Sequence, residues 1–541
     1  MRRGSKQGLR RAFGLTLALV FGACAINPVT RSPEISFMSL DEEKEAGAEA
    51  AKQIEEQIGL VRDEALTAYV RALGARLAAN SPRKDVEYTF NVMDVDFPNA
   101  FALPGGYVYV SRGLLSLVNS EDELASVIGH EIGHVAARHA SASSWRRTTY
   151  GILGGLGTLA GAILGGPLGV LGLGTLSQLG GGGLLAAHSR DQESQADQIG
   201  QDLAFQAGWD PAAISEFLRA LDRDEIQREK AVQEKNFLDS HPITRERIET
   251  TRARAAQLGH PSQLAESHLE RAAFLAHMRG VVIGQDVRSG VFDKDEPTLF
   301  LQPDLGFRIR FPEGWSTLNA PSFVGASDGV VKITLELQGE GTDLKKASRA
   351  HFAKKEREQE EAKKSKDKKR IEPALERNKA GMRRLTKKRA AYVVEGTVQN
   401  GQVTVLQYWI DVKPNIYRLT CVLATEARGS YLNDCRQTAA SVGPIRRKER
   451  ESAKQVTLEL AEARAGEVLE NFNERVGNFW DVDQTAAANG LSLPYTLREG
   501  QLLKYAVAKV YEPAAPTAAA EEPSEPEPTN EASEPGDSSD E

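Results

Sequence analysis

The sequence predicts a protein of several domains: a mainly helical region with a small β element, then an α+β region, then a small module in the order strand, helix, helix, strand. With 541 residues, the chain has room for about three domains. Apolar residues recur at helical spacing from residue 40 to about residue 277, whereas strand-like alternation begins at residue 307. Two short helical patterns then lie between strand-like runs within residues 466–511.

The N-terminus has the features of an export signal. Five Lys and Arg residues precede the apolar run Ala12–Ala23, which is too short to span a bilayer and ends at Cys24. Gly22 and Ala23 before Cys24 resemble a bacterial lipoprotein cleavage site, although Phe21 stands where Leu or Val is usual. We therefore expect residues 1–23 to be a signal peptide and Cys24 to carry lipid. Secretion of a soluble protein is the alternative.

A helix that begins after Ser120 carries the main chemical signal. Ser120 is a good N-cap, and Glu123 completes a capping box. His130 and His134 are four residues apart and lie on one face of this helix, so both imidazoles can bind the same metal ion. Glu131 projects beside them, where it could accept a proton from a water on that metal. Two ordinary core histidines are the alternative interpretation.

A catalytic zinc site needs a third protein ligand. His139 is a poor candidate, because nine residues after His130 it would point to the opposite side of a continuous helix. Glu193 is a better one. It stands four residues before Asp197 on a predicted amphipathic helix, so one carboxylate can bind zinc while the other orients a ligand histidine. A solvated helix face is the alternative.

Taken together, these segments resemble the zinc metalloendopeptidase family of the CAAX prenyl protease and the HtpX-type heat-shock protease, and most of all its bacterial envelope lipoproteins. The resemblance implies a mainly α, gluzincin-type domain that binds one Zn²⁺ per chain through His130, His134 and Glu193. It implies Glu131 as the catalytic acid/base for a zinc-activated water. Asp197, Arg190 and His241 become candidates to orient the ligands or stabilise the reaction. The matching segments follow the family's order: Asn99–Gly106, Gly129–His139, Ser189–Asp197 and Phe237–Pro242.

His241 precedes a proline in a loop after the metal-binding helices, and three roles are open for it. It could stabilise the oxyanion of the reaction, occupy the fourth zinc position as a plug, or cap a helix. Our hypothesis is that His241 faces the zinc.

Two further segments are predicted to meet the substrate. Tyr107–Val110 is apolar and β-prone, and we interpret it as an edge strand that aligns an extended peptide by backbone pairing, with an ordinary core strand as the alternative. Gly151–Gly183 contains fourteen glycines in thirty-three residues and no charge. Because so much glycine disfavours a stable helix, we expect a flexible hairpin or lid near the active site. A transmembrane hairpin is the minority alternative.

Residues 298–445 predict an α+β accessory domain in which binding or spacing is the default role. Leu305–Trp315 mildly resembles small lipoprotein domains of the photosystem-accessory type. If Cys24 carries lipid, Cys421 and Cys435 remain, and an even pair in an exported protein predicts one disulfide. Strands are expected at Phe307–Phe311, Val330–Leu337, Ala391–Val398, Val403–Val412 and Tyr417–Ala424, and helices around Leu344–Ala362 and Ser430–Val442.

The last part of the chain combines a small module with an acidic tail. Residues 466–511 resemble a degenerate LysM module through Asn489–Leu491 and Arg498–Lys504, and the resemblance implies peptidoglycan as a partner. An appendage without glycan affinity is the alternative. Residues 512–541 hold ten acidic residues, six prolines and no Lys or Arg, which predicts disorder. Removing those ten charges takes the net charge from −8 to +2, so the composition does not suggest a nucleic-acid binder.

The motif, the resemblance and the export signal lead us to expect a zinc metalloendopeptidase on the periplasmic side of a bacterial membrane, the outer membrane more than the inner. Its expected substrates are misfolded or misassembled envelope proteins. Two other hypotheses are a periplasmic chaperone or assembly scaffold with a latent or structural zinc site, and a peptidoglycan-associated metallohydrolase. The expected boundaries are 1–23 for the signal, 24–283 for the metallopeptidase domain, 284–297 for a linker, 298–445 for the accessory domain, 446–511 for a helix plus the LysM-like module, and 512–541 for the tail.

Overall fold

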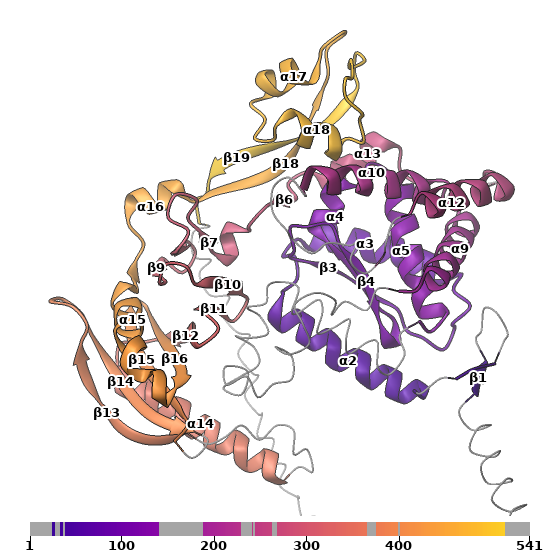
Figure 1. The fold of residues 1–541 in the computed structure, drawn as a ribbon. Helices are drawn as coiled ribbons and strands as arrows, with labels where there is room; N and C mark the ends of the chain where they lie inside the picture. Colours follow the sequence, from indigo (N-terminus) through magenta and orange to yellow (C-terminus); the bar gives the residue numbers. More distant parts are fainter. Residues whose placement is uncertain are drawn as a thin grey trace, which may run out of the picture.

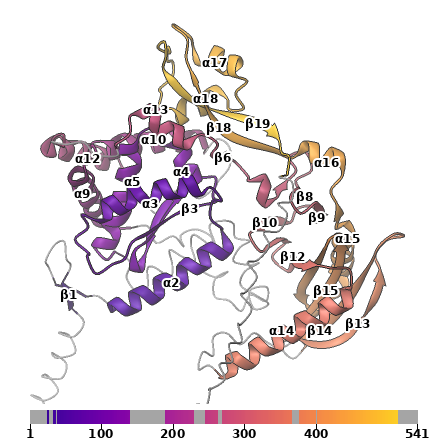
Figure 2. The same ribbon diagram turned by 180° about the vertical axis from the view of Figure 1, so that it is seen from behind.

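The computed structural model describes residues 24–26, 33–35, 38–139, 188–228, 241, 244–261, 268–364, 375–398 and 401–513. The expected signal peptide, the Gly-rich segment 151–183, the stretch 237–242 apart from His241, and the tail beyond residue 513 lie outside these residues. Figure 1 shows the helical region on the right, a long sheet on the lower left, and the C-terminal strands and helices above. Figure 2 shows the same arrangement from behind.

The helical region surrounds helix α5 (Glu121–Ala136), which carries the His motif and is buried along almost its whole length. As expected, the Ser120 hydroxyl accepts a hydrogen bond from the Glu123 N–H (3.1 Å). The Glu123 carboxylate, however, accepts from the backbone N–H of Asn119 (2.7 Å). The other helices are α2 (Leu40–Gln57), α3 (Glu64–Ala78), α4 (Arg112–Leu117), α9 (Arg190–Ala207), α10 (Ala213–Arg228), α12 (Arg245–Leu258) and α13 (Arg271–Met278).

A three-stranded sheet lies beside these helices. Strand β5 (Tyr107–Ser111) is its middle strand, parallel to β3 (Thr89–Met93) and antiparallel to β4 (Ala100–Leu103). The interpretation of Tyr107–Val110 as an edge strand is therefore wrong, and the core-strand alternative is right. The reason is burial, because every residue of β5 after Tyr107 is buried. Among the described residues, β4 is an outer strand of this sheet, and it packs against α5.

The accessory region is built on a seven-stranded sheet in the order β10-β11-β12-β16-β15-β14-β13. Helix α14 (Leu344–Lys364) packs on the face that carries Trp409 and Ile416, and α15 (Arg428–Ser441) packs on the opposite face. A disulfide joins Cys421 of the sheet to Cys435 of α15. The strands are β10 (Ser316–Ala320), β11 (Phe323–Ser327), β12 (Val331–Glu340), β13 (Glu376–Arg384), β14 (Ala390–Val398), β15 (Val403–Val412) and β16 (Asn415–Ala424). A smaller sheet holds β7 (Val291–Phe292), β8 (Leu299–Gln302), β9 (Phe307–Arg310) and β17 (Gly443–Pro444).

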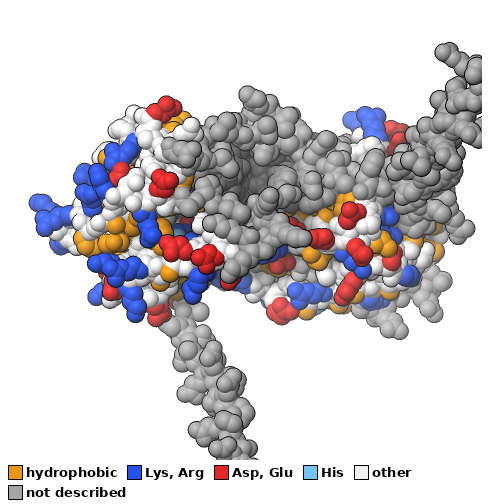
Figure 3. Space-filling view, turned by 90° about the horizontal axis from the view of Figure 1, so that it is seen from below, with side chains coloured by type: hydrophobic (Ala, Val, Ile, Leu, Met, Phe, Trp, Pro, Cys, Tyr) orange, Lys and Arg blue, Asp and Glu red, His pale blue; other side chains and the backbone are white. Residues whose placement is uncertain are grey.

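Strand β13 is a strand that the sequence pattern did not predict. Almost all of its residues are exposed, so it lacks the alternation of apolar and polar residues that marks a half-buried strand. Lys and Arg are common in this strand. Seen from below, blue side chains gather at the left end of the molecule, the side on which Figure 1 places β13 (Figure 3).

The C-terminal module follows the expected order of strand, helix, helix and strand, but its first strand lies before residue 466. Strand β18 pairs with the last strand of the module and also with β6 (Val282–Ile283) of the helical region. Leu458 of β18 is part of the core around α5. The module consists of β18 (Lys454–Glu462), α17 (Leu469–Val476), α18 (Val482–Ala488) and β19 (Leu502–Val510), preceded by the short helix α16 (Arg447–Ser452).

Lys504 fixes this module to the helical region. Its side chain is fully buried, and its ammonium group donates to the carbonyl oxygens of Ser116, Leu117 and Val118 at 2.8–2.9 Å. These carbonyls lie at the end of α4, directly before the cap of α5. Strand β19 therefore touches the segment that leads into the helix with the His motif. No helix within the described part of the chain is long and apolar enough to cross a membrane.

Candidate metal centre

Helices α5 and α9 approach closely because glycines lie at their contact. A Cβ atom on Gly133 would come within 2.7 Å of the carbonyl oxygen of Ala196. A Cβ atom on Gly200 would come within 2.8 Å of the backbone nitrogen of His130. Because these neighbours are backbone atoms in a close-packed interior, a larger residue would push the helices apart. The glycines thus allow the histidine face of α5 to reach Glu193 on α9.

Four side chains direct ligand atoms to one point between the helices: His130, His134, Glu193 and His241. Nε2 of His130 lies 3.0 Å from Nε2 of His134 and 3.3 Å from Nδ1 of His241. Oε1 of Glu193 lies 3.3 Å from Nε2 of His134 and 3.0 Å from Nδ1 of His241. The structure therefore brings together the three residues expected as ligands, and His241 faces the same point.

The chemistry and spacing of these donors fit a zinc ion. Imidazole and carboxylate are common zinc ligands, and a tetrahedral ion with bonds of about 2.0–2.2 Å keeps its ligand atoms roughly 3.3–3.6 Å apart. The separations here are 3.0–3.5 Å. The two Nε2 lone pairs that face each other across 3.0 Å repel unless a cation or a proton lies between them. All four side chains are buried.

Asp197 orients His130, as the sequence suggested. Its Oδ1 lies 2.8 Å from Nδ1 of His130, so the Nδ1–H donates to the carboxylate and Nε2 is left for the metal. Burial alone would lower the pKa of His130, but the hydrogen bonds and charges of Asp197 and Glu193 raise this pKa to about 9. For Asp197, burial opposes ionisation, yet Arg247 and His130 hold its pKa below the usual value.

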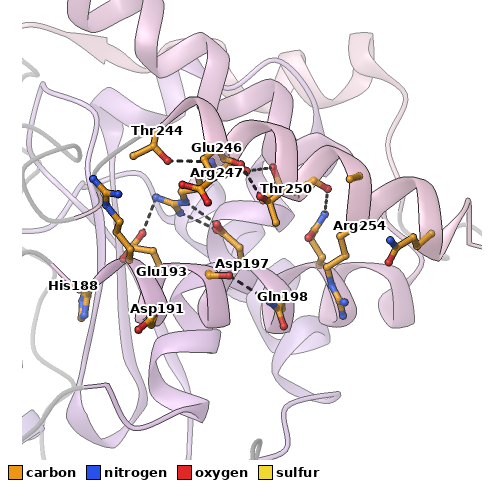
Figure 4. Close-up of a pocket in the computed structure, with 16 residues that line it drawn as sticks. His188, Asp191, Glu193, Asp197, Gln198, Thr244, Glu246, Arg247, Thr250 and Arg254 are labelled. Carbon is orange, nitrogen blue, oxygen red and sulfur yellow. Dashed lines mark hydrogen bonds and ion pairs between the residues drawn. The ribbon is translucent and has the colours of Figure 1, made fainter.

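Arg247 is the residue that the sequence reasoning missed. Its Nη1 lies 2.7 Å from Oε2 of Glu193, and its Nε and Nη2 donate to the two oxygens of Asp197 at 2.7 and 2.8 Å. In Figure 4 the guanidinium of Arg247 points from α12 toward both carboxylates, along a cavity of about 550 Å³ between α9 and α12. Arg190, the expected supporting arginine, is instead the exposed first residue of α9 and lines the same cavity.

His139 lies against the metal centre, contrary to the expectation that it points away. That expectation assumed a continuous helix, but α5 ends at Ala136, and Arg138 has a positive φ of 56° that reverses the chain. His139 therefore returns to His134, and their Nδ1 atoms lie 2.8 Å apart. His188 also stands beside this group, with its ring centre 4.0 Å from that of His134.

Glu131 lies next to the four donors without being one of them. It is 1% exposed, and its Oε1 is buried with no hydrogen-bond partner among the residues that the structure describes. Burial raises the pKa of Glu131, which brings the carboxyl closer to the range in which it can exchange a proton at neutral pH. The ring of His241 spans the gap beside it, with Nε2 3.7 Å from Oε1 of Glu131 and Nδ1 facing the donors.

Comparisons with known proteins agree with this geometry. The profile of peptidase family M48 matches residues 64–255, the part of the chain that holds all of these residues. Metalloprotease YcaL of Escherichia coli (strain K12) is 30% identical over 194 residues, which cover 35% of this chain and 69% of YcaL. This chain belongs to peptidase family M48. Its M48 domain supplies the two helices, the donor cluster and Glu131 within one buried site.

Other M48 relatives match a smaller share of their own length. The beta-barrel assembly-enhancing protease of Yersinia pestis is 32% identical over 237 residues, which are 43% of this chain and 48% of that protein. The mitochondrial metalloendopeptidase OMA1 of Schizosaccharomyces pombe is 34% identical over 226 residues, 41% of this chain and 63% of OMA1. The chain thus spans about half the length of the assembly-enhancing proteases it matches.

A comparison with solved structures finds cyanobacterial PsbP (CyanoP) from Synechocystis sp. PCC 6803. The match has 13% sequence identity and a TM-score of 0.22, and it covers 30% of this chain and 98% of CyanoP. A TM-score of this size supports no conclusion about the present chain.

Proposed function

We propose that this protein is a zinc-dependent metalloendopeptidase of the bacterial cell envelope that cleaves misfolded or misassembled envelope proteins. The observation that carries the proposal is the buried cluster of His130, His134 and Glu193 with the carboxylate of Glu131 beside it. The envelope location is supported by the export-signal pattern that ends at Cys24, the expected site of a lipid anchor, and by relatives named beta-barrel assembly-enhancing proteases.

The residues of the site divide the work of peptide hydrolysis. When bound, zinc would polarise the scissile carbonyl and acidify a water. Glu131 would accept the proton of that water and later give it to the leaving amine. Asp197 keeps Nδ1 of His130 protonated, and Arg247 holds the Glu193 carboxylate in place.

Strand β4, rather than the expected Tyr107–Val110, is the better candidate to align the substrate. It is an outer strand among those described, and it packs against α5, the helix that carries Glu131. An extended peptide that pairs with the outer edge of β4 would place a peptide bond along this helix.

Within this proposal, His241 is a plug that keeps the site latent. Its Nδ1 takes the fourth donor position, where the reaction needs room for water or substrate, and its ring stands in front of Glu131. His241→Ala should therefore bind zinc more weakly and hydrolyse casein faster than the wild type. An unchanged rate together with an unchanged zinc affinity would contradict the plug.

The deciding experiment compares casein hydrolysis by zinc-loaded residues 25–541 with that of Glu131→Gln, each also in a His241→Ala background. Zinc content is measured in all four proteins. We expect activity only where Glu131 is present, at equal zinc, and more of it without His241. Full zinc occupancy with no hydrolysis in any of the four would overturn the peptidase proposal and favour the scaffold hypothesis, which the closed four-donor site also supports.

We further propose that peptidoglycan is a partner of residues 466–511. The support is that helices α17 and α18 and strand β19 of these residues follow strand β18, in the order expected for such a module, together with the LysM-like sequence pieces. Native protein should be retained on purified sacculi, and heat-denatured protein serves as the control. Equal recovery of native protein with and without sacculi would remove both the glycan partner and the hypothesis of a peptidoglycan-directed hydrolase.

A further inference from the structure

The ring nitrogen of His134 that faces away from the metal donors begins a chain of two hydrogen bonds. Nδ1 of His134 lies 2.8 Å from Nδ1 of His139, and Nε2 of His139 lies 2.8 Å from Oε1 of Gln195. His139 follows α5, and Gln195 belongs to α9, so the chain of bonds joins the two helices that supply the metal donors. His139 is buried, at 7% exposure.

The backbone is shaped to place His139 there. Arg138 has a left-handed φ of 56°, a conformation that is strained for a residue other than glycine. The Arg138 side chain is anchored by the Met38 carbonyl oxygen (3.0 Å) and the Glu43 carboxylate (3.2 Å). The N–H of His139 donates to the His134 carbonyl oxygen (3.0 Å). Hydrogen bonds of the Arg138 side chain and of the His139 backbone therefore both stabilise the turn.

The direction of the two hydrogen bonds decides which nitrogen of His134 carries its proton. A neutral imidazole has one N–H and one acceptor nitrogen. If residue 195 accepts from Nε2–H of His139, then Nδ1 of His139 is an acceptor and takes the hydrogen bond from Nδ1–H of His134. Nε2 of His134 then has a free lone pair directed at the other donors.

A donor at residue 195 would reverse the chain. Nε2 of His139 would accept, its Nδ1–H would donate to Nδ1 of His134, and the proton of His134 would sit on Nε2. That proton would occupy the metal-binding lone pair. The amide of Gln195 can present either group, because its oxygen accepts and its nitrogen donates. The arrangement with Oε1 toward His139 is the one that leaves His134 ready to bind a metal.

We propose that His139 and Gln195 are positioning residues that set the tautomer of His134, and that the site binds zinc tightly only when residue 195 accepts a hydrogen bond. The proposal rests on the proposed function in one respect, that the cluster binds zinc. The tautomer of His130 is set by the carboxylate of Asp197. The tautomer of His134 is set instead by the two hydrogen bonds that run through His139 to Gln195, which we call the relay. An ionised carboxylate can only accept hydrogen bonds, whereas the two hydrogen bonds of the relay can run in either direction.

The test replaces Gln195 with an obligate acceptor, Gln195→Glu, and with an obligate donor, Gln195→Lys. The matched controls are Gln198→Glu and Gln198→Lys, which place the same charges nearby on α9 without touching His139. Gln195 and Gln198 both line an open hollow of about 570 Å³, so there is room for the new side chain at either position. Zinc affinity is measured by competition with a chelator.

We expect Gln195→Glu to bind zinc as tightly as the wild type or more tightly, and Gln195→Lys to bind about 10–100-fold more weakly. The two control variants should differ from each other by much less. The second readout is the ¹⁵N NMR signature of His134 in metal-free protein, with the proton on Nδ1 in Gln195→Glu and on Nε2 in Gln195→Lys. In a His139→Phe background the difference between Glu and Lys at residue 195 should shrink to that of the controls.

Two results would overturn the proposal: a Glu-to-Lys difference at residue 195 no larger than that at residue 198, or the same His134 tautomer in both residue-195 variants. Neither readout depends on peptide hydrolysis. If the wild type binds no zinc, the proposed function fails, while the tautomer measurement still tests the relay.

Discussion

Nη1 of Arg247 lies 2.7 Å from Oε2 of Glu193, so a guanidinium from α12 touches the carboxylate that α9 contributes to the donor cluster. The same guanidinium makes a two-pronged contact with Asp197. One buried cation thus balances two buried carboxylates, and α12 is tied to the metal centre.

Arg247→Met should strongly destabilise the protein. It would leave Glu193 and Asp197 buried without their cation, and breaking a buried ion pair from one side costs about 3–5 kcal/mol. The control is Arg254→Met, because Arg254 pairs with Asp202 at the partly exposed side of the same helix. Urea unfolding gives the free energy of unfolding of both variants for comparison with the wild type. Equal losses in the two variants would show that Arg247 has no special role.

Gly200→Ala should weaken zinc binding. The added methyl group would meet the backbone of His130 and push α5 away from α9. The His130 and His134 donors would then move away from Glu193. Chelator competition measures the zinc affinity, and Gln198→Ala, an exposed change on the same helix, serves as the control. If Gly200→Ala keeps its zinc affinity while losing thermal stability, the close approach serves packing alone.

Lys504→Met should loosen the C-terminal module. Three carbonyl groups at the end of α4 would lose their buried donor, at a cost of about 1–3 kcal/mol. Limited proteolysis should then release residues after 453 more quickly than in Lys509→Met, where the replaced lysine is exposed on the same strand. Identical digestion of the two variants would mean that other contacts hold the module.

Lys332 on β12 gives a pH dependence that can be separated from the metal centre. Burial lowers its pKa from 10.5 to about 8. Because the folded protein binds this proton less tightly than the unfolded chain, Lys332 lowers the stability fully below pH 8, and this penalty fades as the pH rises to 10.5. Lys332→Met should therefore raise the melting temperature at pH 7, and the gain should shrink between pH 8 and pH 10.5. The exposed change Lys346→Met should show no such trend.

The meeting of His130, His134, Glu193 and Asp197 could be predicted because each of the two pairs lies four residues apart on a helix, and helical geometry places such a pair on one face. Arg247 could not be predicted. Arg245 and Arg247 stand in the same short charged run, and only the packing of α12 on α9 selects the second. His139 was misplaced because no glycine or proline follows Ala136 within the next ten residues to signal that the helix ends there.

The order of the strands in the three-stranded sheet could not be predicted from the sequence for a similar reason. An apolar run such as Tyr107–Val110 is equally compatible with an edge strand and a middle strand, and its partners β3 and β4 decide the question. The strands β14, β15 and β16 were predicted well, because both faces of the sheet are largely buried there and the strands are rich in apolar and β-branched residues. Strand β13 gave no such signal.

Because Leu458 and Lys504 contact the surroundings of α5, this part of the helical region can be completed only late in the synthesis of the chain. Both residues are synthesised more than three hundred positions after His134, yet Leu458 completes the core around α5 and Lys504 donates hydrogen bonds to the segment that leads into this helix. While the polypeptide is being made, its helical region lacks these supports. The donor cluster would therefore gain its full structural support only after almost the whole chain has been synthesised.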